Sequence, residues 1–178
     1  EEDLLRIHKF ILNNGCDCII AAGGGKVLDA GKYLADHLSI PCITVPLSAS
    51  TCAGWTSLSN IYTIKGQFIK DVPLKSCPKI LVFDHKFIQT APERTLSSGI
   101  ADALAKWYES SLTSSTVDDG LVQQAIQISR VLRDQLLIDG EKAFTGEFEN
   151  NLSWQNTVEA CGLTAGLVGG IGGEKCRT

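Results

Sequence analysis

Three consecutive glycines, Gly23, Gly24 and Gly25, stand between a short apolar run and the start of a helical pattern. Glycine lets backbone N–H groups approach a phosphate with no Cβ in the way. The helix that follows offers unpaired N–H donors and a partial positive charge, and Lys26 adds a full charge. The pattern predicts a pyrophosphate-binding loop. A tight turn that holds no ligand is the alternative, because the motif is neither GxGxxG nor Walker A.

A second polar loop begins where the next apolar run ends. Ser48, Ser50, Thr51 and Thr56 follow the run 42–46. Ligands of open parallel sheets bind at the carboxyl ends of the strands. We therefore expect the glycine loop and this loop to line the same site.

Asp102 is the third feature of chemical interest in the sequence. It is flanked by small residues in the stretch SGIADALAKWYE, so that an ion or ligand can come close to its carboxylate. Its spacing from Lys106 also suits an ordinary ion pair along one face of a helix, with Asp102 in the first helical turn. The residues by themselves favour the ion pair.

The hydrophobic periodicity predicts the elements that carry these residues. Helices are expected over 2–14 and from Lys26 to before Pro41, strands over 18–22, 42–46 and 79–83, and a hairpin over 60–69 that turns at Lys65–Gly66. After residue 91 the pattern is helical at about 92–111, 117–138 and 152–168, with a loop over 169–174.

The predicted fold class is α/β. The pattern predicts an α/β segment over 1–91, of the Rossmann-like type, followed by an all-helical segment over 92–178. Three or four strands are too few for a complete doubly wound domain, so we interpret the chain as an internal part of a longer protein.

Composition narrows the function classes. The chain has 178 residues, a net charge of −4 and no basic cluster, which argues against nucleic acid as a partner. It shows no apolar run of about 18 residues, as a membrane helix would need, and its acidic, amphipathic start does not look like a signal peptide. None of the seven Cys lies in a CxxC pair. Reduced thiols and a cytoplasmic location are therefore expected.

Three ordered motifs carry a resemblance to a known family. The stretches AAGGGKVLDAGKYLADHLSIPCITVP, SASTCAGWTSLSNIYT and PERTLSSGIADALAKWYE resemble glycerol dehydrogenase and the iron-containing (group III) alcohol dehydrogenases. The resemblance implies hydride transfer between NAD or NADP and a secondary alcohol, which is a glycerol-like polyol or a 2-hydroxy acid formed from a 2-oxoacid. It also implies a divalent metal, Zn or Fe, and we expect the full-length enzyme to be a homo-oligomer. The family's fold further implies that 1–91 is a partial Rossmann-like dinucleotide-binding domain and that 92–178 is part of an all-helical metal and substrate domain.

The resemblance also assigns roles to residues of this chain. Asp102 is implied to act in catalysis by ligating the metal, and Cys52 is implied to face the substrate. The implied coenzyme-binding residues are Gly23, Gly24, Gly25, Lys26, Leu47, Ser48, Ala49, Ser50, Thr56, Leu58 and Tyr62.

The chain departs from the family pattern in three places. Its His residues, His8, His37 and His85, lie in the wrong segments to be metal ligands, and two His ligands are expected beyond Thr178. Cys52 stands where glycerol dehydrogenases carry a polyol-binding Asp, as in the hydroxycarboxylate dehydrogenase branch. Leu47 replaces a Thr that usually faces the coenzyme.

Two alternatives stay open. One is a lyase similar to dehydroquinate synthase, which shares the glycine loop and a metal. The other is an inactive truncated fragment that at most binds nucleotide. Trp107 and Tyr108 are expected to pack between helices, and Lys106 to form an ion pair on its helix. The sequence does not choose between NAD and NADP.

Overall fold

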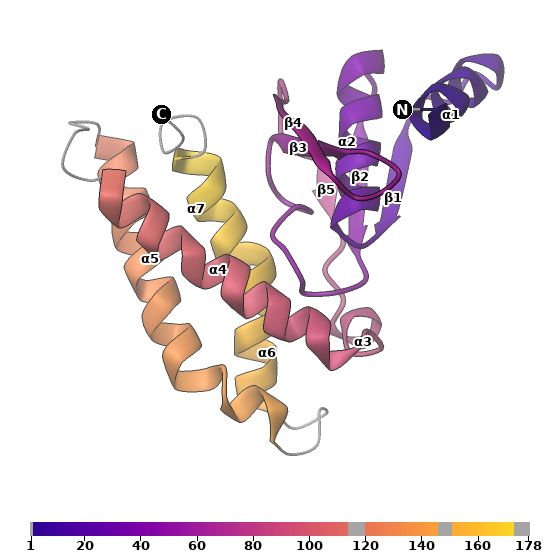
Figure 1. Ribbon diagram of the computed structural model, residues 1–178. Coiled ribbons are helices and arrows are strands. Elements are labelled where there is room, and N and C mark those ends of the chain that lie inside the picture. The colour runs from indigo at the N-terminus through magenta and orange to yellow at the C-terminus, as the bar shows by residue number, and fades with distance from the viewer. Residues whose placement is uncertain (1, 114–119, 146–150, 173–178) are drawn as a thin grey trace.

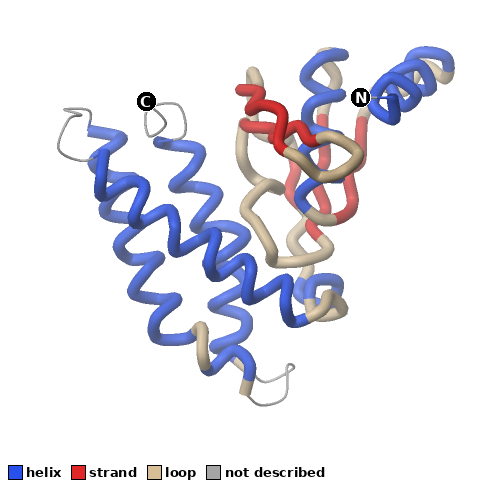
Figure 2. The backbone as a smooth tube through the Cα atoms, in the orientation of Figure 1, coloured by secondary structure: helices blue, strands red, loops and turns tan. Residues whose placement is uncertain are grey.

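The computed structural model describes residues 2–113, 120–145 and 151–172. Within these residues the strands precede the long helices of the second half, and Figure 1 shows the two groups of elements side by side. The same division is visible in Figure 2, where the strands gather on one side of the chain and a helical layer lies beside them.

A parallel three-stranded sheet organises the first half of the chain. Strands β1 (Ile19–Gly23), β2 (Cys42–Pro46) and β5 (Ile80–Leu81) pair in the order β1-β2-β5. Helix α2 (Gly25–Leu38) connects β1 to β2 and packs on both of them. Parallel strands need such a crossover helix, and the apolar runs of β1 and β2 are typical of strands buried in a parallel sheet.

An antiparallel hairpin packs on the same helix. Strands β3 (Leu58–Tyr62) and β4 (Phe68–Pro73) pair with each other, and β3 contacts α2. Gly66 has a φ of 82° in the turn, a backbone conformation that glycine adopts without strain. The hairpin predicted to turn at Lys65–Gly66 is therefore confirmed.

Helices form most of the remainder. Helix α1 (Glu2–Asn13) precedes the sheet, and only Ile11 of its predicted apolar stripe is buried. The short α3 (His85–Ile88) is capped by Asp84 and leads to α4 (Glu93–Thr113). The later elements are α5 (Gly120–Asp139), the 3-10 turn η1 (Lys142–Phe144), α6 (Leu152–Glu159), the π-helix η3 (Ala160–Thr164) and α7 (Ala165–Gly172).

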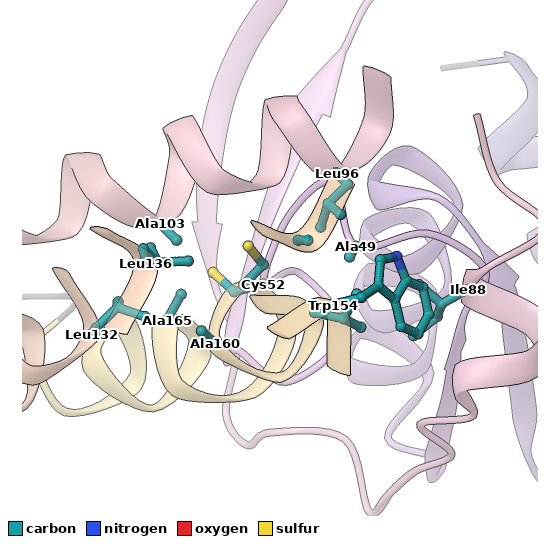
Figure 3. Close-up of a cluster of buried hydrophobic side chains, with 13 residues drawn as sticks. Ala49, Cys52, Ile88, Leu96, Ala103, Leu132, Leu136, Trp154, Ala160 and Ala165 are labelled. Carbon is teal, nitrogen blue, oxygen red and sulfur yellow. The ribbon is translucent and has the colours of Figure 1, made fainter. Parts of the chain in front are cut away.

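Two buried clusters fill the interior. One lies between the sheet and α2 and includes Ala21, Leu28 and Ala35. The larger one lies among α4, α5 and the α6–α7 segment, and it also takes in two residues from the loop after β2, Ala49 and Cys52 (Figure 3). This loop is therefore packed into the helical core.

Several sequence predictions need correction. The strand expected over 79–83 is limited to Ile80–Leu81, which pairs only with β2 at the sheet edge. Residues 169–172, expected as a loop, continue α7, because packing of α7 on α5 outweighs the low helix propensity of glycine. Residues 173 and 174 of that expected loop lie outside the described residues. Residues 117–119 of the helix expected over 117–138 also lie outside them, and α5 forms the rest of that helix.

Three further expectations concern single residues. Asp102 lies in the middle of α4 and not in a first helical turn, because the helix already begins at Glu93 and continues through Gly99. The strand expected over 18–22 begins at Ile19, so Cys18 lies just outside it. Tyr108 is 64% exposed and is not buried between helices. Trp107 does meet another helix, since the Arg133 guanidinium carbon lies 4.4 Å from its ring centroid.

Within the described residues, none of the helices is both long enough and apolar enough to cross a membrane.

Candidate functional site: the coenzyme loops and Asp102

The two predicted binding loops lie at the same edge of the sheet. Gly23, the last residue of β1, is opposite Pro46, the last residue of β2. The backbone N–H of Leu47 donates a hydrogen bond of 3.0 Å to the carbonyl oxygen of Gly23. The start of the second loop is therefore fixed directly against the glycine loop, as the position of ligand sites in parallel sheets predicts.

The three glycines differ in what surrounds them. A Cβ at Gly23 would lie 2.8 Å from the Cβ of Val27, and a Cβ at Gly25 would lie 2.9 Å from Cγ2 of Thr51. Packing within the chain therefore accounts for these two glycines. A Cβ at Gly24 would meet nothing nearer than Oγ of Ser48 at 4.0 Å. Gly24 lies at the N-terminus of α2, so its open side leaves room for a ligand beside unpaired N–H donors.

Polar and cationic side chains surround this opening. The hydroxyl oxygens of Ser48 and Ser50 are 3.0 Å apart. Lys26, in the first turn of α2, places its Nζ 5.5 Å from the ring centroid of Tyr62, at the end of β3. This contact brings the β3–β4 hairpin next to the glycine loop. Ala49, by contrast, is buried in the helical core, so its side chain does not face this opening.

A buried ion pair lies beneath the loops, and sequence reasoning missed it. The carboxylate of Asp29 lies 3.0 Å from Nζ of Lys32, and both side chains are buried. Burial raises the pKa of the Asp29 carboxyl, and Lys32 acts in the opposite direction. The i, i+3 spacing of the two residues was the available signal, but it does not reveal that both are buried.

Lys32 also bonds to two of the predicted coenzyme residues. Its Nζ donates to the carbonyl oxygen and the hydroxyl oxygen of Thr56, each at 3.2 Å, and to the carbonyl oxygen of Leu58 at 2.5 Å. The segment that carries Thr56 and Leu58 is therefore tied to helix α2.

Asp102 approaches the same loop from the helical side. The backbone N–H of Cys52 and the side chain of Thr51 face its carboxyl group and lower its pKa. Burial raises the pKa of Asp102, Lys106 lowers it and Glu109 raises it. Lys106, expected to form an ion pair with Asp102, pairs instead with Glu109, whose Oε2 lies 3.4 Å from Nζ.

The close approach of helix and loop has a steric basis in Gly99. A Cβ at Gly99 would overlap the carbonyl oxygen of Ala49. Only glycine at this position of α4 lets the helix lie against the loop, and Asp102 is one turn further along the same helix. The sequence stretch SGIADALA thus contains Gly99, which permits the contact between helix and loop, and Asp102, which faces the loop.

The predicted substrate residue, Cys52, is buried. Burial raises the pKa of its thiol to about 11, so the group is neutral near pH 7. Cys161 on the π-helix interacts with both Cys52 and Asp102, and burial raises its thiol pKa to about 12. π-Helical turns are frequent at functional sites. The two thiols near Asp102 are thus uncharged, and the charged groups that act on its pKa are Lys106 and Glu109.

The described residues offer a metal ion one candidate ligand at this place. No group of three or more His, Cys, Asp or Glu able to hold a metal occurs among residues 2–113, 120–145 and 151–172. The rings of His8 and His37 pair with each other, with centroids 5.4 Å apart. His85 Nε2 lies 3.2 Å from Oε1 of Glu159. The carboxylate of Asp102 therefore suits a metal as a single oxygen ligand, not as a complete site.

Comparison with known proteins agrees with this arrangement. Residues 1–85 match the family model described as iron-containing alcohol dehydrogenase. The chain is related to the iron-containing alcohol dehydrogenases. It is 37% identical to a glycerol dehydrogenase of Pseudomonas putida over 143 residues, covering 78% of this chain and 39% of that protein. It is 34% identical to hydroxycarboxylate dehydrogenase A of Escherichia coli over 163 residues, covering 89% and 45%.

The fold of these dehydrogenases is shared as well. The structure of glycerol dehydrogenase from Schizosaccharomyces pombe superimposes with a TM-score of 0.80 at 31% identity, covering 94% of this chain and 44% of that one. The predicted fold class and family resemblance are confirmed. These relatives are oxidoreductases, so the lyase alternative gains no support. The chain spans less than half the length of each of the three.

Proposed function

We propose that this chain forms the coenzyme loops and provides one metal ligand of an NAD(P)- and metal-dependent alcohol dehydrogenase. The observation that carries the proposal is the contact between Asp102 and the loop of Thr51 and Cys52. That loop begins beside Gly24, which leaves room for a phosphate, so the coenzyme loops and the candidate metal ligand lie next to each other.

Each group has a distinct task in this proposal. Backbone N–H groups around Gly24 and the N-terminus of α2 bind the coenzyme pyrophosphate, assisted by Lys26. Thr56, Leu58 and Tyr62 line the nicotinamide side. Asp102, deprotonated, holds the metal through a carboxylate oxygen. A bound divalent metal supplies Lewis acidity toward the alcohol oxygen. The rest of the work is to align the substrate carbon with the nicotinamide and to exclude water.

The substrate we propose is a 2-hydroxy acid or its 2-oxoacid, in preference to glycerol. Cys52 supports this choice, because a neutral thiol is a weak partner for vicinal hydroxyls. It also lacks the negative charge with which a carboxylate would repel an acidic substrate. The second candidate is a glycerol-like polyol, favoured by the 37% identity to a glycerol dehydrogenase.

The test is a coupled set of assays on the full-length protein. NADH and NADPH oxidation is followed with a panel of 2-oxoacids, and NAD and NADP reduction with 2-hydroxy acids and polyols, before and after chelation and after return of Zn²⁺ or Fe²⁺. We expect turnover that chelation removes and metal restores. Turnover unaffected by chelation, or none with any pair, would contradict the proposal.

A further inference from the structure

Lys32 is a charged side chain that the proposed reaction does not use. It is 2% exposed, among the most completely buried large side chains of the described residues. An ammonium group has three N–H donors and no acceptor. Asp29, Thr56 and Leu58 together present four oxygen atoms within hydrogen-bonding or ion-pairing distance of Nζ. No donor is left over, so Lys32 does not serve as a ligand-binding cation or a proton donor.

The atoms that Lys32 joins belong to two parts of the proposed coenzyme site. Lys32 and Asp29 lie on α2, the helix whose N-terminus faces the pyrophosphate position. Thr56 and Leu58 lie on the segment proposed for the nicotinamide side. A second bond supports the same connection, because the Ser59 hydroxyl donates to the carbonyl oxygen of Asp29 at 2.9 Å.

Burying this charge pair is costly. Taking a carboxylate and an ammonium out of water is repaid only when their mutual geometry and hydrogen bonds are good, and apolar residues of similar size often stabilise a fold equally well. A pair of this kind is therefore weak evidence for stability. The hydrogen bonds from Lys32 to Thr56 and Leu58 point instead to a role in fixing the position of that segment.

We propose that Lys32 is a positioning residue for the nicotinamide half of the coenzyme, an inference that rests on the proposed function. By holding the backbone at Thr56 and Leu58 at a fixed distance from α2, it sets the distance between the pyrophosphate and nicotinamide subsites. Lys32 is a determinant of coenzyme alignment that acts without touching the coenzyme.

Two probes separate this role from a general loss of structure. NADH spans both subsites, whereas ADP occupies only the adenosine and pyrophosphate part. Kd for each is measured on the full-length protein with Lys32→Met, which keeps the chain length and removes the charge. Because this variant leaves Asp29 buried and unpaired, Asp29→Asn combined with Lys32→Met is prepared as well. Lys79→Met makes the same chemical change at an exposed position and is the control.

We expect the Lys32 variants to raise Kd for NADH at least about tenfold while Kd for ADP stays within about twofold. They should also raise KM for NADH more than they lower kcat at saturating NADH. Equal weakening of NADH and ADP, unchanged binding of both, or failure of both variants to fold would overturn the proposal. Gly24→Val is measured beside them. If that substitution leaves the binding of ADP and NADH unchanged, the proposed coenzyme site is wrong, whatever the Lys32 variants show.

Discussion

The carboxyl group of Asp102, in the middle of helix α4, faces the backbone N–H of Cys52, in the loop that follows strand β2. This contact joins the helical half of the chain to the edge of the parallel sheet. It places Asp102, the candidate metal ligand, against a loop that begins beside the glycines. The predictions below depend on this connection and on the open space at Gly24.

The first prediction concerns Gly24. Replacing it with Val fills the space beside the N-terminus of α2 and displaces the coenzyme pyrophosphate. We expect Kd for NAD(H) to rise at least about tenfold, roughly 1.4 kcal/mol, with little change in the stability of the full-length protein. Fluorescence titration with NADH gives the value. Gly120→Val is the matched control, because a Cβ there meets no atom within 4 Å and the site is remote. An unchanged Kd in the Gly24 variant would reject the assignment of this loop to phosphate binding.

A second prediction concerns Asp102. Asp102→Asn keeps the size of the side chain but removes the negative charge that a metal prefers. We expect metal content after dialysis to fall well below one per chain and kcat to fall at least about 100-fold, as is usual when support for a catalytic metal is lost. Glu109→Gln, an exposed carboxylate on the same helix, is the control. Full metal content in the Asp102 variant would remove this residue from the ligand set.

The third prediction concerns substrate choice. Glycerol is expected to be a poor substrate of the full-length protein, with a kcat/KM below that of the best 2-hydroxy acid. Cys52→Asp should narrow or reverse this preference, because a carboxylate binds hydroxyls and repels acids. Cys52→Ser, similar in size and uncharged, should leave the preference in place. A wild-type kcat/KM for glycerol above that of every 2-hydroxy acid tested would defeat the assignment.

The fourth prediction concerns stability and pH at Asp139, the last residue of α5. Its carboxylate accepts hydrogen bonds from Ser153 at 2.7 Å and Asn156 at 3.0 Å, which connect α5 to α6, and from Gln135. The bond from Ser153, followed by that from Asn156, lowers the pKa of Asp139 below its usual value. Because the folded-state pKa is below the unfolded one, the stabilisation is present above the unfolded pKa, near 4, and is lost as pH falls through the folded pKa.

Asp139→Asn should therefore lower the free energy of unfolding by about 1.5–3 kcal/mol at pH 7, the range for hydrogen bonds to a charged group. The difference from wild type should shrink as pH falls below about 4. Urea unfolding at several pH values measures both. Asp134→Asn, an exposed carboxylate on the same helix, is the control. A difference that stays constant down to pH 2 would mean that the charge of Asp139 contributes nothing.

Local patterns in the sequence predicted local structure well. The strand over 42–46, the hairpin turn at Gly66 and the glycine loop agree with the structure, because each depends on the conformational preferences of neighbouring residues. The helix over 169–172 was missed, since tertiary packing there outweighs propensity. The site was predicted less completely. The bonds from Lys32 to Thr56 and the contact of Thr51 with Asp102 join residues far apart in sequence. Hydrophobic periodicity does not predict contacts of this kind.

The central claim is hydride transfer between a nicotinamide and a carbon of a small alcohol. The most direct measurement uses the full-length, metal-loaded protein with NADH dideuterated at C4 and the 2-oxoacid that gives the highest turnover. Mass spectrometry of the 2-hydroxy acid then reports the origin of the new C–H bond. The account predicts one deuterium bound to C2 of the product and loss of the same deuterium from the coenzyme. A product that carries only solvent hydrogen at C2, or no transfer of deuterium between coenzyme and any 2-oxoacid or polyol-derived ketone tested, would contradict it.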